Sequence, residues 1–247
     1  MIALELFTRD GGVFLSRYAH YLAGITWIGL LYYFNFVQTP AFATFDAPAR
    51  TEAISKLVPR ALWWFRWAAV FTVLSGFFVL YFQRDFENNY FQRPSGISIA
   101  TGALLGLIML ANVWGVIWRN QKTVIRSAQG VGAGGAALPE AADAGRRAGL
   151  ASRTNTVFSI PLLFFMAFTS HLAPHYNGGN PVEGSKRLLY WLPVLVVIAL
   201  FELNGLGVIG GIGQSGTKKY LETHRAAIIT GFVLAALFYI WFEVCFH

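Results

Sequence analysis

Long apolar runs separated by short polar segments dominate the pattern of this chain. Each run has about twenty residues, enough to cross the hydrocarbon core of a bilayer as a helix. The runs cover residues 13–38, 61–83, 97–118, 154–173, 188–211 and 226–246. The pattern therefore predicts an all-α integral membrane protein, a six-transmembrane-helix bundle that forms a single domain over residues 1–247.

One long polar stretch, residues 120–152, interrupts this pattern. Its centre, AQGVGAGGAALPEAADAGRR, is rich in Gly and Ala and has no hydrophobic periodicity. Such composition is typical of flexible linkers. It predicts a mobile cytoplasmic loop between the third and fourth spans, with a short amphipathic helix around residues 138–150 as an alternative.

The distribution of basic residues predicts the orientation in the membrane. The segments that follow the first, third and fifth runs hold about two thirds of the 19 Lys and Arg residues. Cytoplasmic loops carry such an excess, so these segments are predicted to be cytoplasmic and both termini periplasmic.

Composition supports the membrane assignment and excludes several classes of protein. The chain is 55% hydrophobic and 13% charged, with a mean hydropathy of +0.51, whereas soluble domains are about one quarter charged. The net charge of +7 falls between apolar runs, which indicates topology signals and anionic lipid headgroups rather than nucleic acid. The single cysteine, Cys245, excludes an intramolecular disulfide, a cysteine-ligated zinc site and a covalent C-x-x-C-H haem.

Histidines provide the candidate chemistry. His20 lies inside the first run, RYAHYLAGITWIGLLYYFNFVQTP, and an ionisable side chain within a span marks a functional site by default. At 1.5 Å per residue it lies roughly 10 Å below the outer surface. His171, near the outward end of the fourth run, and His175, just beyond it, are expected in the same leaflet.

This placement predicts a haem b site. Two imidazoles from different helices can bind the iron from opposite faces of the macrocycle. The predicted ligands are His20 and His171, with His175 as the substitute for His171. Arg17, one turn before His20, is expected to pair with a haem propionate. The alternative is that His20 forms a hydrogen bond with a carbonyl or hydroxyl group on a neighbouring helix.

Polar residues also recur toward the cytoplasmic halves of the runs. They suit a substrate pocket, a proton path or an interhelical hydrogen-bond network, of which the network is favoured. The residues are Asn35, Asn112, Arg119, Asn120, Arg153, Asn155, Glu202 and Asn204.

Three blocks carry a family resemblance. RYAHYLAGITWIGLLYYFNFVQTPAF, LANVWGVIWRNQKTVI and SRTNTVFSIPLLFFMAFTSH together resemble the membrane domain of the bacterial urate hydroxylase family, also described as urate oxidase N-terminal domain proteins. The resemblance implies a bacterial inner-membrane helical protein associated with a cytochrome c. It places His20 in the first block and His171 in the last. The spacing of His20 and Trp27 also looks like the first helix of membrane protoporphyrinogen oxidase.

The sequence departs from that family at one point. Full-length members carry a C-terminal cytochrome c domain with C-x-x-C-H, and this motif does not occur here. The resemblance is therefore to a stand-alone form, which would pass electrons to a separate cytochrome c or a respiratory complex. The expected function is haem b-dependent electron transfer, with urate hydroxylase-like oxidoreductase activity left open. A cofactor-free accessory subunit of a larger respiratory or photosynthetic membrane complex is the alternative, and a transporter is disfavoured because no inverted repeat is found.

Overall fold

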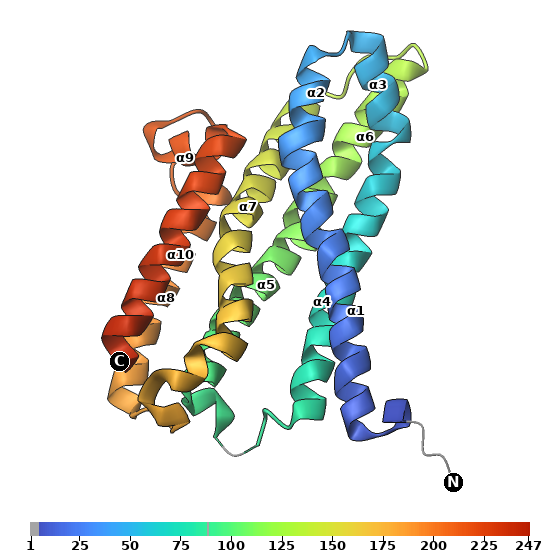
Figure 1. Ribbon diagram of the computed structural model, residues 1–247. Helices are drawn as coiled ribbons and strands as arrows, with labels where there is room; N and C mark the ends of the chain where they lie inside the picture. Colours follow the sequence, from blue (N-terminus) through green and yellow to red (C-terminus); the bar gives the residue numbers. More distant parts are fainter. Residues whose placement is uncertain (1–4, 88) are drawn as a thin grey trace.

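The fold is a bundle of long, roughly parallel helices (Figure 1). The computed structural model describes residues 5–87 and 89–247. Within these residues the longer helices form six rods. They are α1 (Arg9–Tyr32) with the π-helical segment η2 (Tyr33–Gln38) and α2 (Thr39–Thr44); α3 (Ala47–Lys56) with α4 (Val58–Gln83); α5 (Pro94–Asn112) with the π-helical segment η4 (Val113–Ile117) and α6 (Trp118–Gly132); α7 (Ala141–His171); α8 (Gly184–Gly205); and α10 (His224–Phe246). Short helices lie at the rod ends: η1 (Glu5–Phe7), η3 (Tyr90–Gln92), η5 (Ala173–Gly179), η6 (Gly216–Lys218) and α9 (Lys219–Glu222).

Side-chain caps explain where several helices begin. The Thr8, Asp46 and Thr223 side chains accept hydrogen bonds from backbone N–H groups in the first turns of α1, α3 and α10. An N-terminal turn has backbone donors without intrahelical partners, and short oxygen-bearing side chains satisfy them. α4 ends where Arg84 adopts the left-handed conformation, with φ of 60°. The starts and stops of these rods are therefore encoded locally.

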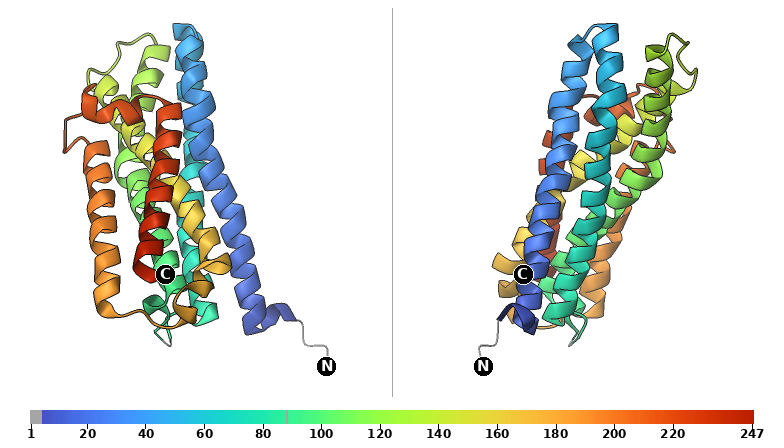
Figure 2. Two further views of the ribbon diagram at one scale, coloured as in Figure 1. Left: turned by 60° about the vertical axis from the view of Figure 1, so that its left-hand side comes forward. Right: turned by 90° about the vertical axis from the view of Figure 1, so that its right-hand side faces the viewer.

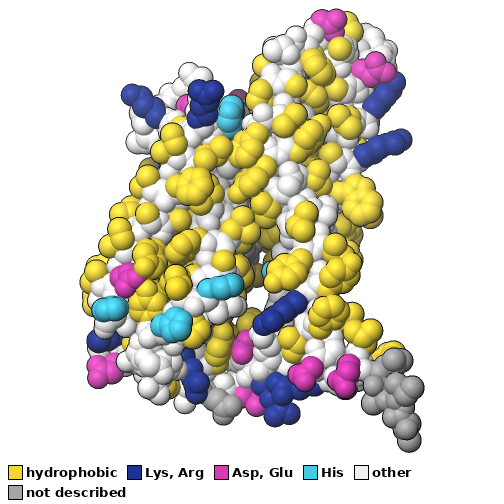
Figure 3. Space-filling model, viewed as in Figure 1, with side chains coloured by type: hydrophobic (Ala, Val, Ile, Leu, Met, Phe, Trp, Pro, Cys, Tyr) yellow, Lys and Arg dark blue, Asp and Glu magenta, His cyan; other side chains and the backbone are white. Residues whose placement is uncertain are grey.

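The rods form two groups. α1 packs mainly on α4, whereas α5, α7, α10 and α8 pack on one another. The groups meet where α3 and α4 pack on the α5–α6 rod and where α1 and η2 approach α7. Figure 2 shows α1 diverging from the other group toward the end that holds the chain termini. Figure 3 shows an opening between the α1–α4 pair and the second group in that half of the molecule. We refer to this half as the termini half, and to the other as the loop half.

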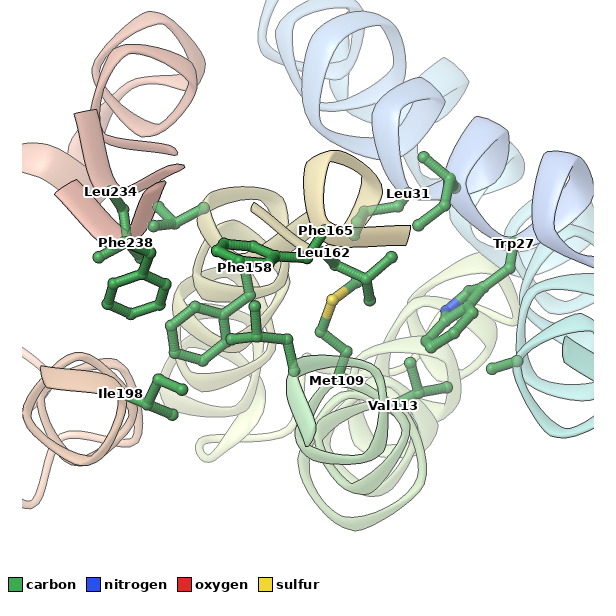
Figure 4. Packing of buried hydrophobic residues seen from close by; sticks show 14 of the residues in the cluster. Trp27, Leu31, Met109, Val113, Phe158, Leu162, Phe165, Ile198, Leu234 and Phe238 are labelled. Carbon is green, nitrogen blue, oxygen red and sulfur yellow. The ribbon is translucent and has the colours of Figure 1, made fainter. Parts of the chain in front are cut away.

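The core between the groups is apolar. Trp27 of α1, Met109 of α5 and Phe165 of α7 are almost completely buried, and Figure 4 shows them converging with their neighbours on the axis of the bundle. On the face shown in Figure 3, hydrophobic side chains cover the middle of the bundle, while most charged side chains lie toward the two ends. A band of apolar surface between charged ends is the arrangement that a bilayer requires.

The prediction of six spans is confirmed only in part. Among the described residues, four helical stretches are long and apolar enough to cross a membrane: Ala47–Gln83, Pro94–Gly132, Gly184–Gly205 and His224–Phe246. The pair Ala141–His171 and Ala173–Gly179, bent by 55°, makes a fifth if it is one span. The first predicted span is helical, but its Tyr, His, Asn and Gln residues make it less apolar. The chain is a multi-pass helical membrane protein with four or five spans of this kind.

The prediction of a mobile linker at residues 120–152 is corrected by the structure. α6 continues to Gly132 and α7 begins at Ala141, so only residues 133–140 lie outside these helices. Alanine has the highest helix propensity, and the small side chains of this segment allow α6 and α7 to pack together and α6 to pack on α3. A Gly/Ala-rich composition therefore produced closely packed helices here.

Candidate functional site

His20 lies half-buried at the α1–α4 interface. Its Nδ1 is 2.8 Å from the backbone carbonyl oxygen of Thr72 and 3.4 Å from Ser75 Oγ. Because a carbonyl oxygen can only accept, Nδ1 is the donor and carries the proton. In the neutral imidazole the lone pair is then on Nε2, which is the atom available to a ligand. The hydrogen bond of His20 to a carbonyl group on a neighbouring helix, which the sequence analysis gave as the alternative, is thus present. This hydrogen bond also fixes the tautomer of the ring.

Small residues on α4 make room for this imidazole. Thr72 and Ser75 direct their hydroxyl groups to their own helix, to the carbonyl oxygens of Ala68 and Phe71. A Cβ atom at Gly76 would lie 3.1 Å from His20 Cε1, so glycine permits the close approach. Sequence reasoning missed these three α4 positions. The signal was their spacing, which places three small residues on one face of a helix that is otherwise rich in bulky side chains.

His171 and His175 lie on the other helix group. His171 is exposed at the end of α7, and its Nδ1 is 2.9 Å from the Ala167 carbonyl oxygen. It therefore has the same tautomer as His20, with Nε2 free. His175 is exposed in η5. Both lie at the end of α7 that faces the termini half, but no hydrogen bond or ring contact joins them to His20 among the described residues.

Arg17 is exposed one turn before His20. In the amide orientation that satisfies both neighbours, Gln83 accepts a hydrogen bond from Arg17 and donates one to Asp85, with an N–O distance of 3.2 Å. Burial raises the pKa of the Asp85 carboxyl group, and the positive charge of Arg17 opposes that rise. Arg17 therefore forms a polar cluster with Gln83 at the end of α4 and Asp85 in the loop that follows.

A second polar arrangement links three helices of the other group. Asn112 of α5 donates to Asn155 Oδ1 on α7 at 2.9 Å and to Glu202 Oε2 on α8 at 3.0 Å. Asn155 in turn donates to the Met109 carbonyl oxygen at 3.0 Å. The predicted interhelical hydrogen-bond network thus exists for these residues. Asn204 lies apart from it and accepts from Tyr220 in the loop between α8 and α10.

Basic side chains of α7 hold that loop. Arg146 donates to both oxygens of Glu222, at 3.0 and 2.6 Å, and to the Ile212 carbonyl oxygen. Arg153 donates to the Leu221 carbonyl oxygen at 2.7 Å. The hydrogen bonds from Arg146 lower the pKa of Glu222. We name Arg146 and Glu222 the loop clamp.

The loop clamp predicts a specific loss of stability in acid. Because the folded state lowers the Glu222 pKa below its ordinary value of 4.5, the clamp stabilises the fold above that value and is lost as the pH falls through the lowered pKa. Glu222→Gln should lower the melting temperature at pH 7 and flatten its dependence on pH below about 4.5. Thermal unfolding between pH 3 and 7 measures this. The control is Glu140→Gln, outside the clamp, whose melting temperature should depend on pH as that of the native chain does. If the melting temperature of Glu222→Gln also depends on pH as in the native chain, the role of the clamp is contradicted.

Comparison with known proteins now adds a family. The family described as "Urate oxidase N-terminal" matches residues 84–183. The match covers 100 of the 247 residues, so this segment of the chain is similar to that family. Comparisons with curated proteins and with solved structures give no match.

The matched segment divides the candidate site. It runs from the end of α4 to η5 and so contains α5, α6 and α7 with His171 and His175. It also contains the second and third sequence blocks that resemble the family. His20, Arg17 and their α4 partners precede it. The urate oxidase N-terminal segment therefore supplies one half of the predicted ligand pair, and a region outside the match supplies the other.

Proposed function

We propose that this urate oxidase N-terminal family membrane protein binds haem b through His20 and transfers electrons within the membrane. The contact of His20 Nδ1 with the Thr72 carbonyl oxygen carries the proposal. Metal-binding histidines commonly donate their second ring N–H to such a carbonyl, which orients the ring and makes the ligating nitrogen more basic. His171, with the same tautomer, would be the second ligand, and His175 is its substitute.

The surroundings of His20 suit such a cofactor. Trp27, two turns further along the same face of α1, is 2% exposed, and its Nε1 has no hydrogen-bond partner in the described part of the chain. A buried N–H group without an acceptor is costly, and Figure 4 shows this nitrogen on the ring edge that faces the bundle interior. Haem carries oxygen atoms only on its propionates, so the aromatic ring of Trp27 rather than its N–H group is what suits the cofactor. Arg17 is the nearest basic residue before His20 in the chain and is proposed to hold a propionate.

Bound haem supplies one-electron chemistry, because its iron alternates between the ferric and ferrous states. The chain has three tasks in this proposal. His20 and His171 bind the iron, the Thr72 carbonyl holds the His20 proton on Nδ1, and the apolar helices exclude water. A periplasmic cytochrome c or a respiratory complex is the proposed electron acceptor, and urate or another small reductant the proposed donor.

One observation favours a second candidate, a cofactor-free accessory subunit. Both His20 and His171 have a carbonyl partner for the Nδ1–H group, so both rings are held without a cofactor. In that case His20 only joins α1 to α4, and His171 forms a hydrogen bond within its own helix.

An absorption spectrum of the purified protein separates the two candidates. The protein should be produced with ample haem and measured oxidised and after dithionite reduction. A Soret band with sharp α and β bands on reduction supports haem b. A folded, colourless protein overturns the haem proposal and favours the accessory subunit.

Gly76 provides a second test of the same site. A Cβ atom at position 76 would already lie 3.1 Å from His20 Cε1. The larger side chain of leucine would therefore collide with the imidazole. We expect Gly76→Leu to lower the haem content of purified protein severalfold, with Gly76→Ala close to the native chain because its single methyl group needs only a small shift. The haem-to-protein absorbance ratio measures this. Equal haem content in all three proteins would contradict the placement of His20.

A further inference from the structure

A cavity of about 240 Å³ lies in the loop half, between the two helix groups. Its wall combines residues of η2, α4, α6 and α7. Phe34 and Leu62 belong to its apolar part, and Asn35, Gln38, Ser152 and Arg153 to its polar part. It is separate from His20, which lies nearer the opposite end of α1 and does not line it.

Two π-helical segments border the cavity. Phe34, Asn35 and Gln38 come from η2, and Ile117 ends η4. A π-helical turn inserts an extra residue into a helix and is frequent at functional sites. Here η2 brings two amide side chains, Asn35 and Gln38, to one cavity wall.

One polar atom in this wall lacks a partner. Gln38 Oε1 is buried and accepts no hydrogen bond within the described residues. The neighbouring Asn35 uses its amide hydrogens internally, donating to the Leu31 carbonyl oxygen at 2.9 Å and to Ser152 Oγ at 2.8 Å. An unpaired buried acceptor costs free energy, so the wall is suited to a ligand that presents an N–H or O–H donor to Gln38.

The charge of the wall is positive. The cavity is lined by Arg146 and Arg153 and, among the described residues, by no Asp or Glu. Glu222 is held by two hydrogen bonds from Arg146. Arg153 forms one hydrogen bond, to the neutral Leu221 carbonyl group. Its guanidinium has five N–H donors, so it retains donors for an anion. The positive charges of Arg146 and Arg153 outnumber the single negative charge of Glu222, which acts on both.

We propose that this cavity binds a small organic anion whose anionic group pairs with Arg153 and whose N–H or O–H group donates to Gln38 Oε1. A single ring fits the volume, and its faces would contact Phe34 and Leu62. The proposal does not depend on haem at His20, because it concerns binding to other residues at the other end of the bundle.

Calorimetric titration tests this in nanodiscs of phosphatidylcholine. The probes are the three hydroxybenzoate isomers, which have one anionic group, one O–H donor and an apolar ring, together with benzoate and inorganic phosphate. We expect at least one hydroxybenzoate to bind about 3- to 10-fold more tightly than benzoate, the range for one hydrogen bond between uncharged groups. Phosphate should bind more weakly than either, because it leaves the apolar wall uncovered.

Variants locate the binding. Gln38→Leu should remove the advantage of hydroxybenzoate over benzoate, and Arg153→Gln should weaken both by at least about tenfold. Arg147→Gln is the matched control, since Arg147 is exposed on the same helix and does not line the cavity. If the Arg153→Gln protein does not fold, the Gln38→Leu protein still tests the proposal by itself.

Three results would overturn the proposal: no binding of any hydroxybenzoate, unchanged preference in Gln38→Leu, or complete loss of binding when the nanodiscs contain phosphatidylglycerol. The last result would assign the cavity to a lipid headgroup.

Discussion

Replacing His20 with alanine is expected to remove nearly all haem b from the purified protein while the bundle remains folded. The imidazole is the proposed iron ligand from α1, and the structure brings no second histidine of α1 or α4 to its position. Losing it also removes one hydrogen bond to the Thr72 carbonyl oxygen, worth only about 1 kcal/mol. The loss of colour should therefore far exceed the loss of stability. The Soret-to-protein absorbance ratio and the melting temperature measure the two effects.

The matched control is His224→Ala. His224 begins α10 in the loop half and contacts the ring of Phe36, with ring centroids 5.9 Å apart. The same substitution there should leave the spectrum unchanged. His171→Ala and His175→Ala then identify the second ligand, since only the ligating one should alter the spectrum. A His20→Ala protein with native haem content would refute the proposed site.

Gly96→Ala is expected to destabilise the fold strongly for a substitution that adds a single methyl group. A Cβ atom at Gly96 would lie 2.0 Å from the Tyr90 carbonyl oxygen and 2.6 Å from Phe91 Cα. Both are backbone atoms of η3, so no side chain can rotate away and the chain itself must shift. Overpacking of this kind costs about 1–3 kcal/mol or more, which lowers the melting temperature of a protein of this size by on the order of 5–10 °C.

Gly29→Ala is the control for this prediction. Gly29 lies on the exposed face of α1, and a Cβ there meets no atom within 4 Å. Alanine in a helix is favoured over glycine by about 0.5–1 kcal/mol, so the melting temperature should stay equal or rise. Fluorescence-monitored thermal unfolding in one detergent compares the two variants. Equal melting temperatures would show that α5 and η3 separate more easily than their contact suggests.

Much of this protein follows from local sequence. Apolar runs predict helices because a membrane leaves no other partners for backbone N–H and C=O groups, and the helices are found at these runs. Caps such as Thr8 and Asp46 mark helix starts because their oxygens satisfy the first free N–H groups. His20 stood out because a histidine within an apolar run is rare. These features depend on residues within a few turns of one another.

Only the tertiary structure decided what surrounds those residues. The contact of His20 with Thr72 spans 52 positions in the chain, and nothing near His20 in sequence indicates Gly76 as its neighbour. The segment at residues 120–152 looked structureless because its small residues lack periodicity, yet it forms helices that pack closely. The cavity likewise depends on Gln38 and Arg153, on two different rods, lining the same space. Helix formation is a local property of the chain, whereas the choice of packing partners depends on the shapes of surfaces that are distant in sequence.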